Sequence, residues 1–232
     1  MKILALDTTA RVASAAICND TQLISLYTQN VGLTHSETML PMIEALLKHS
    51  RTDINDIDLF ACSSGPGSFT GVRIGVSVIK GLAFEKNKQC IGVSTLEALA
   101  RNIVCPNGEI ICPVMDARRN QLYSAMFTYQ EGALVRLTDD DTVDANELAS
   151  KLSSLSKPIH FVGDGYDIMD KMPVPLKNHT QEILRYQNAY SVAMAALEKY
   201  KSNKNNDLRF DDSSLVPEYL RPSQAERTAL NK

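Results

Sequence analysis

The two halves of this sequence open with the same pattern, and this repeat limits the folds that the chain can adopt. Each half starts with a short apolar segment that ends on an aspartate, followed by a tight connection and a second apolar segment. Apolar runs of this length, bounded by turn residues, are typical of buried strands. Placing Asp116 on Asp7 aligns the two openings without a gap. The aligned pairs are Ile3–Leu6 with Cys112–Met115, and Ala13–Cys18 with Leu122–Phe127.

The two halves also end alike, because a strand-like run leads into a glycine-rich turn in each. The first run, 57–64, leads into Gly65-Pro66-Gly67, and the second, 158–162, leads into Gly163-Asp164-Gly165. Strand, hairpin and helix in duplicate match the actin, sugar-kinase and heat-shock ATPase class (ASKHA). We therefore expect an α/β protein with two lobes, each with a mixed sheet flanked by helices. The predicted lobes are residues 1–108 and residues 109–232, the second including the C-terminal tail.

Composition indicates the binding partners and the cellular compartment to expect, but it says little about the activity of the chain. The 232 residues carry a net charge of −3, so the protein has no strong field that would capture nucleic acid. No apolar run approaches the length of a membrane span, so we expect no membrane association. Five cysteines without a CxxC pair are typical of reduced thiols, which predicts a cytoplasmic protein.

Helix signals lie between the predicted strands. Thr34-His35-Ser36-Glu37 has the form of a capping box at the start of an amphipathic helix, in which Pro41 should produce a kink. Ser94-Thr95-Leu96-Glu97 is a second capping box. A last amphipathic helix is expected over Ala189–Lys201, followed by a polar linker, Ser202–Asp207.

The glycine-rich stretch Ser63–Arg73 could be a phosphate site or a structural turn. The free N–H groups at the start of a helix favour anions. However, no Gly-Lys-Ser/Thr follows as in a Walker A loop, the glycine spacing is wrong for a dinucleotide fold, and Pro66 removes one N–H donor. Arg73 is a cation near the loop, although an arginine in this position more often faces solvent. These observations favour a structural turn.

Asp7 and Asp116 are the weak candidates for a nucleotide site. In the actin-like class, aspartates at the ends of these strands orient a metal ion and nucleotide phosphates. The alternative is that both cap turns, as aspartate often does. We favour turn capping because neither aspartate is followed by the glycine-rich hairpin that lets a phosphate approach the backbone.

Six segments together resemble the TsaB family, formerly called YeaZ, a bacterial partner subunit in the synthesis of threonylcarbamoyladenosine in tRNA. The resemblance covers nearly the whole chain, and the motif of the glycine loop is highly specific. The segments are Met1–Thr9, Thr34–Glu37 with Leu40-Pro41, Asp58–Gly75, Gly92–Leu96, Asp116–Arg119 and Pro217–Pro222.

The related TsaD family, the catalytic paralogue, differs from this chain at two positions. Its two metal-binding histidines would fall on Thr95 and Leu99, and neither leucine nor threonine replaces a neutral imidazole. The four histidines of the chain are scattered, and we expect each to be structural. The sequence therefore predicts no catalytic residues and no metal ligands. The four histidines of the chain are His35, His49, His160 and His179.

The resemblance implies a non-catalytic subunit that forms a heterodimer with TsaD and acts with the ATPase TsaE. That complex transfers threonylcarbamoyl from its adenylate to N6 of the adenosine 3′ of the anticodon in tRNAs reading codons that begin with A. This subunit would need no cofactor of its own, since ATP or ADP and the metal belong to its partners. It would meet tRNA only through the complex, and alone it could form a homodimer.

Two other functions stay open from the sequence. One is an ATP-dependent phosphotransferase or ATPase that uses Asp7 and Asp116 around Mg²⁺. The other is a metal-dependent peptidase, which follows from the older naming of the wider family as glycoproteases. A peptidase needs a metal site or a nucleophile with a base, and the sequence offers neither.

The predicted partner interface lies on the first two helices. The first carries an apolar band wider than one core contact requires, and glycines one turn apart on the second permit close helix packing. The alternative is that both helix faces cover the sheet of this subunit. The residues of the predicted partner interface are His35, Met39, Leu40, Met42, Ile43, Leu46, Leu47, Gly71, Arg73, Gly75, Val76 and Ile79.

Overall fold

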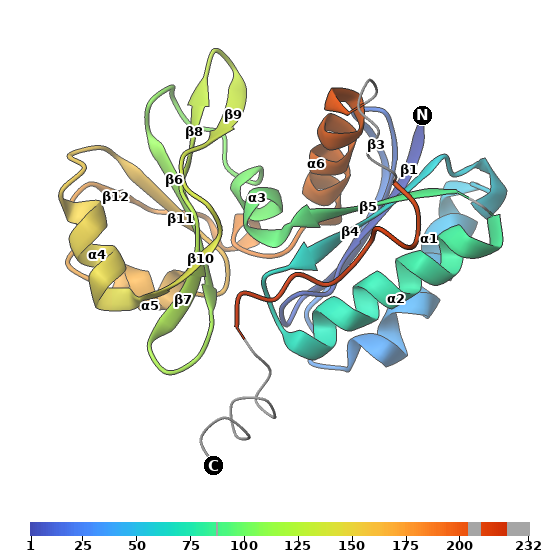
Figure 1. Cartoon of the computed structure of the whole chain (residues 1–232), viewed down its shortest axis with the longest axis horizontal. Coiled ribbons are helices and arrows are strands. Elements are labelled where there is room, and N and C mark those ends of the chain that lie inside the picture. Colours follow the sequence, from blue (N-terminus) through green and yellow to red (C-terminus); the bar gives the residue numbers. More distant parts are fainter. Residues whose placement is uncertain (87, 204–209, 222–232) are drawn as a thin grey trace.

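A computed structural model describes residues 1–86, 88–203 and 210–221 and shows two lobes, each built on its own sheet (Figure 1). The N-terminal lobe has a five-stranded sheet in the order β3-β2-β1-β4-β5. β2 is antiparallel to β1 and β3, whereas β1, β4 and β5 are parallel. The strands are β1 Lys2–Asp7, β2 Ala13–Asn19, β3 Gln22–Gln29, β4 Leu59–Gly65 and β5 Gln89–Ser94.

The C-terminal lobe repeats this plan with a seven-stranded sheet. Its main path runs β10-β7-β6-β11-β12, and β8 pairs with both β6 and β9. β6 corresponds to β1, since it has an antiparallel neighbour, β7, on one side and a parallel neighbour, β11, on the other. The strands are β6 Ile110–Asp116, β7 Gln121–Ser124, β8 Phe127–Gln130, β9 Ala133–Arg136, β10 Asp141–Asp144, β11 Ile159–Val162 and β12 Lys177–Asn178.

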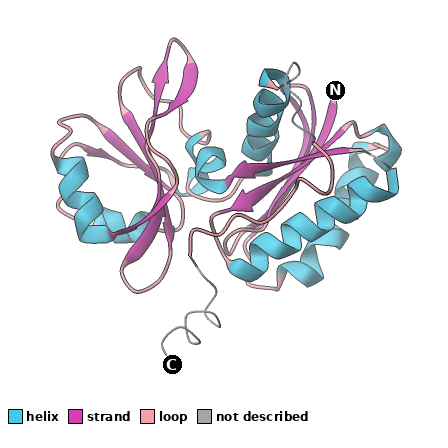
Figure 2. Ribbon diagram, viewed as in Figure 1, coloured by secondary structure: helices cyan, strands magenta, loops and turns pink. Residues whose placement is uncertain are grey.

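Helices cover both faces of each sheet (Figure 2). In the N-terminal lobe, α1 His35–Ser50 and α2 Phe69–Lys86 pack on one face, and α6 Ala189–Ser202 packs on the other. In the C-terminal lobe, α4 Ala145–Ser153 and α5 Tyr166–Asp170 share one face. α3 Thr95–Ala100 packs on the opposite face. Two 3₁₀ turns, Ile54–Asp56 and Glu182–Leu184, complete the elements. None of the described helices combines the length and apolar character needed to span a membrane.

The predicted duplication is confirmed in its topology and is wrong by one residue in its register. Asp7 pairs with Ser14, whereas Asp116 pairs with Leu122, so the second hairpin is one residue shorter. Residues 118–120 all have positive φ, and this left-handed turn tightens the connection. The single strand expected over 122–127 is also interrupted at residues 125 and 126, between β7 and β8.

The predicted lobe boundary requires a correction, because the chain returns to the first lobe. The sequence prediction includes α6 in the C-terminal lobe, residues 109–232. In the structure its apolar side packs against β1, β2 and β4 of the N-terminal lobe. Leu215 lies in the core beneath α1 and α2. The C-terminal lobe therefore ends before Ala189. Most of the linker expected at Ser202–Asp207 lies outside the described residues.

Of the two predicted capping boxes, only the second has the expected cap. Ser94 Oγ accepts a hydrogen bond from the backbone N–H of Glu97 at 3.1 Å. Thr34 Oγ1 instead donates to the Glu37 carboxylate at 2.9 Å and caps no backbone N–H. In the second box, the Glu97 side chain does not complete the cap and instead pairs with Arg101.

Candidate functional site

A cavity of about 620 Å³ lies between the two lobes. Its walls come from the turn after β1, the glycine loop, the end of β6 and the C-terminal tail. The residues that line it are Thr9–Arg11, Pro66–Thr70, Met115–Arg118, Tyr123, Asp164 and Glu218–Arg221.

Asp7, the first nucleotide candidate, does not line this cavity. Its side chain is 1% exposed and accepts hydrogen bonds from three donors. These are the N–H of Thr9 at 2.8 Å, the hydroxyl of Thr9 at 2.6 Å and the hydroxyl of Ser63 at 2.6 Å. Burial raises the pKa of the Asp7 carboxyl, and these hydrogen bonds act in the opposite direction. The contacts favour the turn-capping interpretation, and burial keeps this carboxyl group out of the cavity.

Asp116, the second candidate, does reach the cavity. Its carboxylate accepts a hydrogen bond from the N–H of Arg118 at 2.7 Å. Its own N–H donates to Asp164 Oδ1 at 3.1 Å. Asp164 therefore joins the candidate site, although the sequence marked it only as a turn residue between two glycines. The structure does not bring Asp7 and Asp116 together in the cavity, since only Asp116 lines it.

The glycines of the loop are explained by close contacts within the chain. A Cβ on Gly65 would lie 2.2 Å from the carbonyl oxygen of Glu218, and one on Gly67 would lie 2.5 Å from that of Thr9. The N–H of Ser68 is also used, since it donates to the Thr9 carbonyl at 2.7 Å. A phosphate cradle needs free N–H groups that face a ligand. The geometry supports the structural turn.

The C-terminal tail runs beside this loop and reaches both lobes. The N–H of Glu218 donates to the carbonyl of Ser64 at 2.7 Å. Tyr219 stacks on Phe69 with ring centroids 4.4 Å apart, and its hydroxyl accepts from Arg73 Nε at 2.8 Å. Arg221 donates to the carbonyl of Ala117 across the cavity at 2.9 Å. Arg73 therefore lies against aromatic rings outside the cavity.

Most residues of the predicted partner interface are buried in the core of this subunit. α1 and α2 lie on the same face of the sheet, and their apolar sides fill the space above β1, β2 and β4. The structure therefore places most of the apolar band in the core, and only Leu40 and Leu47 of the band extend beyond it. The buried residues are Met39, Met42, Ile43, Leu46, Gly71, Gly75, Val76 and Ile79.

Only four predicted interface residues reach the surface. Leu40 is 55% exposed, Arg73 is exposed and Leu47 is half-buried. His35 is also half-buried, because its Nε2 lies 2.6 Å from the carbonyl oxygen of Ala10.

The exposed face of α2 carries a different set of residues from the predicted one. Arg73, Ser77, Gly81 and Phe84 are exposed at intervals of three or four residues, so they form one stripe along the helix. Nothing lies within 4 Å of a Cβ built on Gly81. Ser77 and Gly81 repeat the four-residue spacing of Gly71 and Gly75. That spacing could have identified the stripe, but the sequence alone does not tell which pair faces outward.

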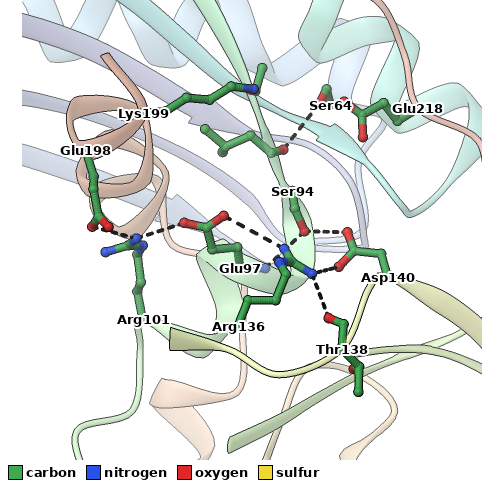
Figure 3. A network of polar contacts seen from close by, with 12 residues as sticks. Ser64, Ser94, Glu97, Arg101, Arg136, Thr138, Asp140, Glu198, Lys199 and Glu218 are labelled. Atoms are coloured by element: carbon green, nitrogen blue, oxygen red, sulfur yellow. Dashed lines mark hydrogen bonds and ion pairs between the residues drawn. The ribbon is translucent and has the colours of Figure 1, made fainter. Parts of the chain in front are cut away.

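A polar network joins the two lobes beside the cavity (Figure 3). Ser94 Oγ donates to Asp140 Oδ2 at 2.5 Å, and Arg136 pairs with the same carboxylate. Arg136 Nη2 also lies 3.8 Å from Glu97, which in turn pairs with Arg101 at 2.8 Å. β9 and the loop before β10 are thus connected to the start of α3.

Thr95 and Leu99, the positions of the histidines in the catalytic paralogue, lie on α3 inside the protein. They are 0% and 1% exposed, and Leu99 packs in the core of the C-terminal lobe. Neither residue lines the interlobe cavity.

Comparison with known proteins identifies the family. The model of the TsaD family, described as tRNA N6-adenosine threonylcarbamoyltransferase, matches residues 29–229. The Bacillus subtilis (strain 168) protein named tRNA threonylcarbamoyladenosine biosynthesis protein TsaB is 31% identical over 97% of this chain and 96% of its own length. Its namesake in Escherichia coli (strain K12) is 33% identical over 72% of each chain.

Solved structures confirm the predicted duplicated α/β fold. YeaZ from Pseudomonas aeruginosa superposes with a TM-score of 0.77 at 23% identity, over 94% of this chain and 99% of that one. An activator of 2-hydroxyisocaproyl-CoA dehydratase from Clostridium difficile, solved with bound ADPNP, shares the fold with a TM-score of 0.53 at 12% identity, over 90% and 99% of the two chains. With a relative matched from end to end, the chain belongs to the TsaB family of tRNA threonylcarbamoyladenosine biosynthesis proteins.

Proposed function

We propose that this chain is a non-catalytic subunit in the synthesis of threonylcarbamoyladenosine in tRNA. The observation that carries the proposal is the match to the Bacillus subtilis TsaB protein over 97% of the chain. The subunit would pair with a TsaD-type transferase and act with a TsaE-type ATPase. Thr95 and Leu99 support the non-catalytic role, because both are buried and neither supplies an imidazole to a metal.

The exposed stripe of α2 is the best-supported partner surface. Ser77 and Gly81 are small, so a partner helix could approach α2 closely there. Phe84 is 75% exposed and supplies apolar area at one end of the stripe. Leu40 adds an exposed apolar side chain from α1, which lies on the same face of the sheet. A homodimer formed in the absence of the partner would use the same surface.

The alternative of an ATP-dependent phosphotransferase receives less support. It requires Asp7 and Asp116 to share a metal ion, but Asp7 is 1% exposed and its oxygens are occupied by Thr9 and Ser63. We expect ATP or ADP and the catalytic metal to belong to the partner subunits, and tRNA to meet this subunit only through the complex.

Reconstitution tests the proposal. The chain is mixed with the TsaD-type and TsaE-type proteins of the same organism, ATP, threonylcarbamoyl-adenylate and unmodified tRNA, and modified adenosine is measured by mass spectrometry of the digested tRNA. We expect modification only when this chain is present. Equal modification without it would overturn the proposal.

Surface variants then locate the interface. Gly81→Arg and Phe84→Glu should each weaken binding to the TsaD-type partner by about tenfold or more, as loss of a central contact does. Val104→Glu is the matched control, because Val104 is 87% exposed on the segment after α3. Changes at Leu46 or Gly75 would not serve, since both residues are buried and their replacement would disturb the fold.

A further inference from the structure

Three side chains with metal-binding chemistry meet in the C-terminal lobe. One ligand atom from each of Cys105, Glu109 and His160 lies within 4.8 Å of the other two. All three residues are half-buried. The sequence separates His160 from the other two by about fifty positions, so the expectation of scattered, purely structural histidines missed this group.

The loop before β6 brings Cys105 and Glu109 to the same side. The chain reverses at Pro106–Gly108, where Gly108 has a φ of 86° and the N–H of Glu109 donates to the carbonyl of Pro106 at 3.3 Å. β8 holds this loop in place: the N–H of Gly108 donates to the carbonyl of Tyr129 at 3.2 Å, and Thr128 Oγ1 donates to that of Glu109 at 2.7 Å.

His160 approaches from the neighbouring strand. β11 is parallel to β6, and His160 pairs there with Ile111, two residues after Glu109. Its Nε2 lies 2.6 Å from Glu109 Oε2 and 3.0 Å from Asn178 Nδ2. The side chains of His160 and Glu109 are only 16% and 21% exposed. The short contact between Nε2 and the carboxylate joins these two groups, and the Cys105 sulfur lies close by.

We propose that Cys105, Glu109 and His160 bind a Zn²⁺ ion. Thiolate sulfur, imidazole nitrogen and carboxylate oxygen are the ligands that zinc takes in proteins, at about 2.3, 2.0–2.1 and 2.0–2.2 Å respectively. Softer thiolate ligation also disfavours Mg²⁺ and Ca²⁺ at such a site. Water completes the tetrahedron, or the Asn178 amide oxygen does so after rotation of the amide.

Binding exchanges a proton for the metal. Zn²⁺ replaces the thiol proton of Cys105, which is released, while the imidazole of His160 binds through Nε2 and carries its proton on Nδ1; no electron is transferred. The distance between Nε2 and Oε2 must widen from 2.6 Å to about the spacing of two ligands on one tetrahedral ion. A side-chain rotation of Glu109 at its half-exposed loop would supply that change.

The position of the group indicates a structural role. None of the three residues lines the interlobe cavity, so a zinc ion here would not revive the peptidase alternative. The metal would instead fasten the segment between α3 and β6 to β11. This proposal does not rest on the proposed function, and it departs from our expectation that the chain has no metal ligands.

The first test uses the untagged wild-type protein with Zn²⁺ or Co²⁺ alone. Competition with a chromophoric chelator should show one zinc per chain, and Co²⁺ should give a thiolate-to-cobalt charge-transfer band. Zinc should also slow alkylation of Cys105 in the native protein, because this sulfur would be coordinated. Cys105 is a suitable probe because the other cysteines, Cys18, Cys62, Cys90 and Cys112, are buried.

Variants assign the ligands. Cys105→Ser and His160→Gln should each weaken zinc binding by more than about tenfold, since even loss of an outer-shell partner costs about 10–100-fold. Cys105→Ser should also abolish the charge-transfer band. His179→Gln is the control, because His179 is an exposed histidine of the same lobe that contacts Tyr166 and lies outside the proposed ligand group.

Three results would overturn the proposal: no zinc bound by the wild type, a charge-transfer band that survives Cys105→Ser, or alkylation of Cys105 at the same rate with and without zinc. The alkylation and wild-type spectra need no variant, so they decide the matter even if a substitution prevents folding.

Discussion

Asp7 ends the first strand of the N-terminal lobe, and its environment decides what an aspartate there can do. The carboxylate is buried and accepts hydrogen bonds from Thr9 and Ser63. It therefore connects the ends of β1 and β4 beneath the interlobe cavity. Asp116, at the matching position, lies at the surface of that cavity. Two residues that align in the repeat thus differ in exposure, because the turn that follows β1 covers only the first of them.

The first prediction concerns pH and the variant Asp7→Asn. Burial raises the pKa of folded Asp7, so the folded state retains a proton that the unfolded chain has lost above about pH 4. Wild-type stability relative to Asp7→Asn should therefore fall as pH rises from about 4 to the folded pKa, and then stay constant. Urea unfolding of both proteins over that range measures the difference.

Comparison with the variant removes the contribution of the other acidic groups, which both proteins share. An increase in relative wild-type stability with pH would contradict the prediction. It would mean that the three hydrogen bonds to the carboxylate outweigh the cost of burying its charge.

At the scale of one element, α2 shows how small residues serve two purposes. Gly71 and Gly75 face the end of β1, where a Cβ would lie 2.0 Å from the Thr8 carbonyl oxygen and 2.6 Å from Thr8 Oγ1 respectively. Ser77 and Gly81 face outward. The first pair lets the helix pack on its own sheet, and the second leaves open space on the outer side of the helix.

The second prediction compares two alanine substitutions in this helix. Gly75→Ala should lower the free energy of unfolding by about 1–3 kcal/mol, because the new methyl group meets Thr8 Oγ1 and Leu6 in a packed core. Gly81→Ala should raise it by about 0.5–1 kcal/mol, since alanine favours the helix and nothing lies nearby. Chemical denaturation measures both.

Each substitution controls for the other, because both add the same methyl group to the same helix. Equal effects of the two would show that close packing does not explain Gly75.

At the scale of the whole molecule, the two lobes have separate cores and share a small number of connections. α1, α2 and α6 enclose the first sheet, and α3, α4 and α5 enclose the second. The tail joins them across the cavity, and the polar network of Figure 3 joins them through a second set of contacts. In this network Ser94 both caps α3 and donates to Asp140 of the other lobe.

The third prediction is a double-mutant cycle between the lobes. The hydrogen bond from Ser94 to Asp140 should give a coupling of about 1–3 kcal/mol, since its acceptor is charged and the Asp140 side chain is only 14% exposed. Ser94→Ala, Asp140→Ala and the double variant are compared by urea unfolding.

Ser94→Ala combined with Asp170→Ala is the control, because Asp170 is 55% exposed and belongs to α5. Its coupling should be near zero. If the coupling between Ser94 and Asp140 is no larger than that of the control pair, the hydrogen bond does not stabilise the contact between the lobes.

Much of the fold could be predicted from local patterns. The strands β1, β2 and β3 and the helix α6 lie where periodicity placed them, and the repeat gave the correct topology. The register of the second hairpin was wrong, because three consecutive residues with positive φ at 118–120 leave no mark in an ungapped alignment. The tail of the chain was assigned to the wrong lobe, since an amphipathic helix does not specify which sheet it covers.

The candidate sites were harder to predict, because a local pattern does not specify which elements pack together. Thr95 and Leu99 excluded the histidine site of the catalytic paralogue without any structure, because ligand chemistry is a property of the side chain itself. By contrast, the sequence placed the predicted partner surface partly on residues that are buried, such as Leu46, and it did not show that Gly81 faces outward. It also gave no sign that His160 meets Cys105 and Glu109.

The sequence by itself determined the family, the repeat and the residue types that limit the chemistry, since these follow from local pattern and composition. Only the tertiary structure decided which apolar face is core, which glycine faces outward and which distant side chains converge. Those outcomes depend on how strands and helices far apart in the chain pack together, and the same helical periodicity is compatible with either face being buried.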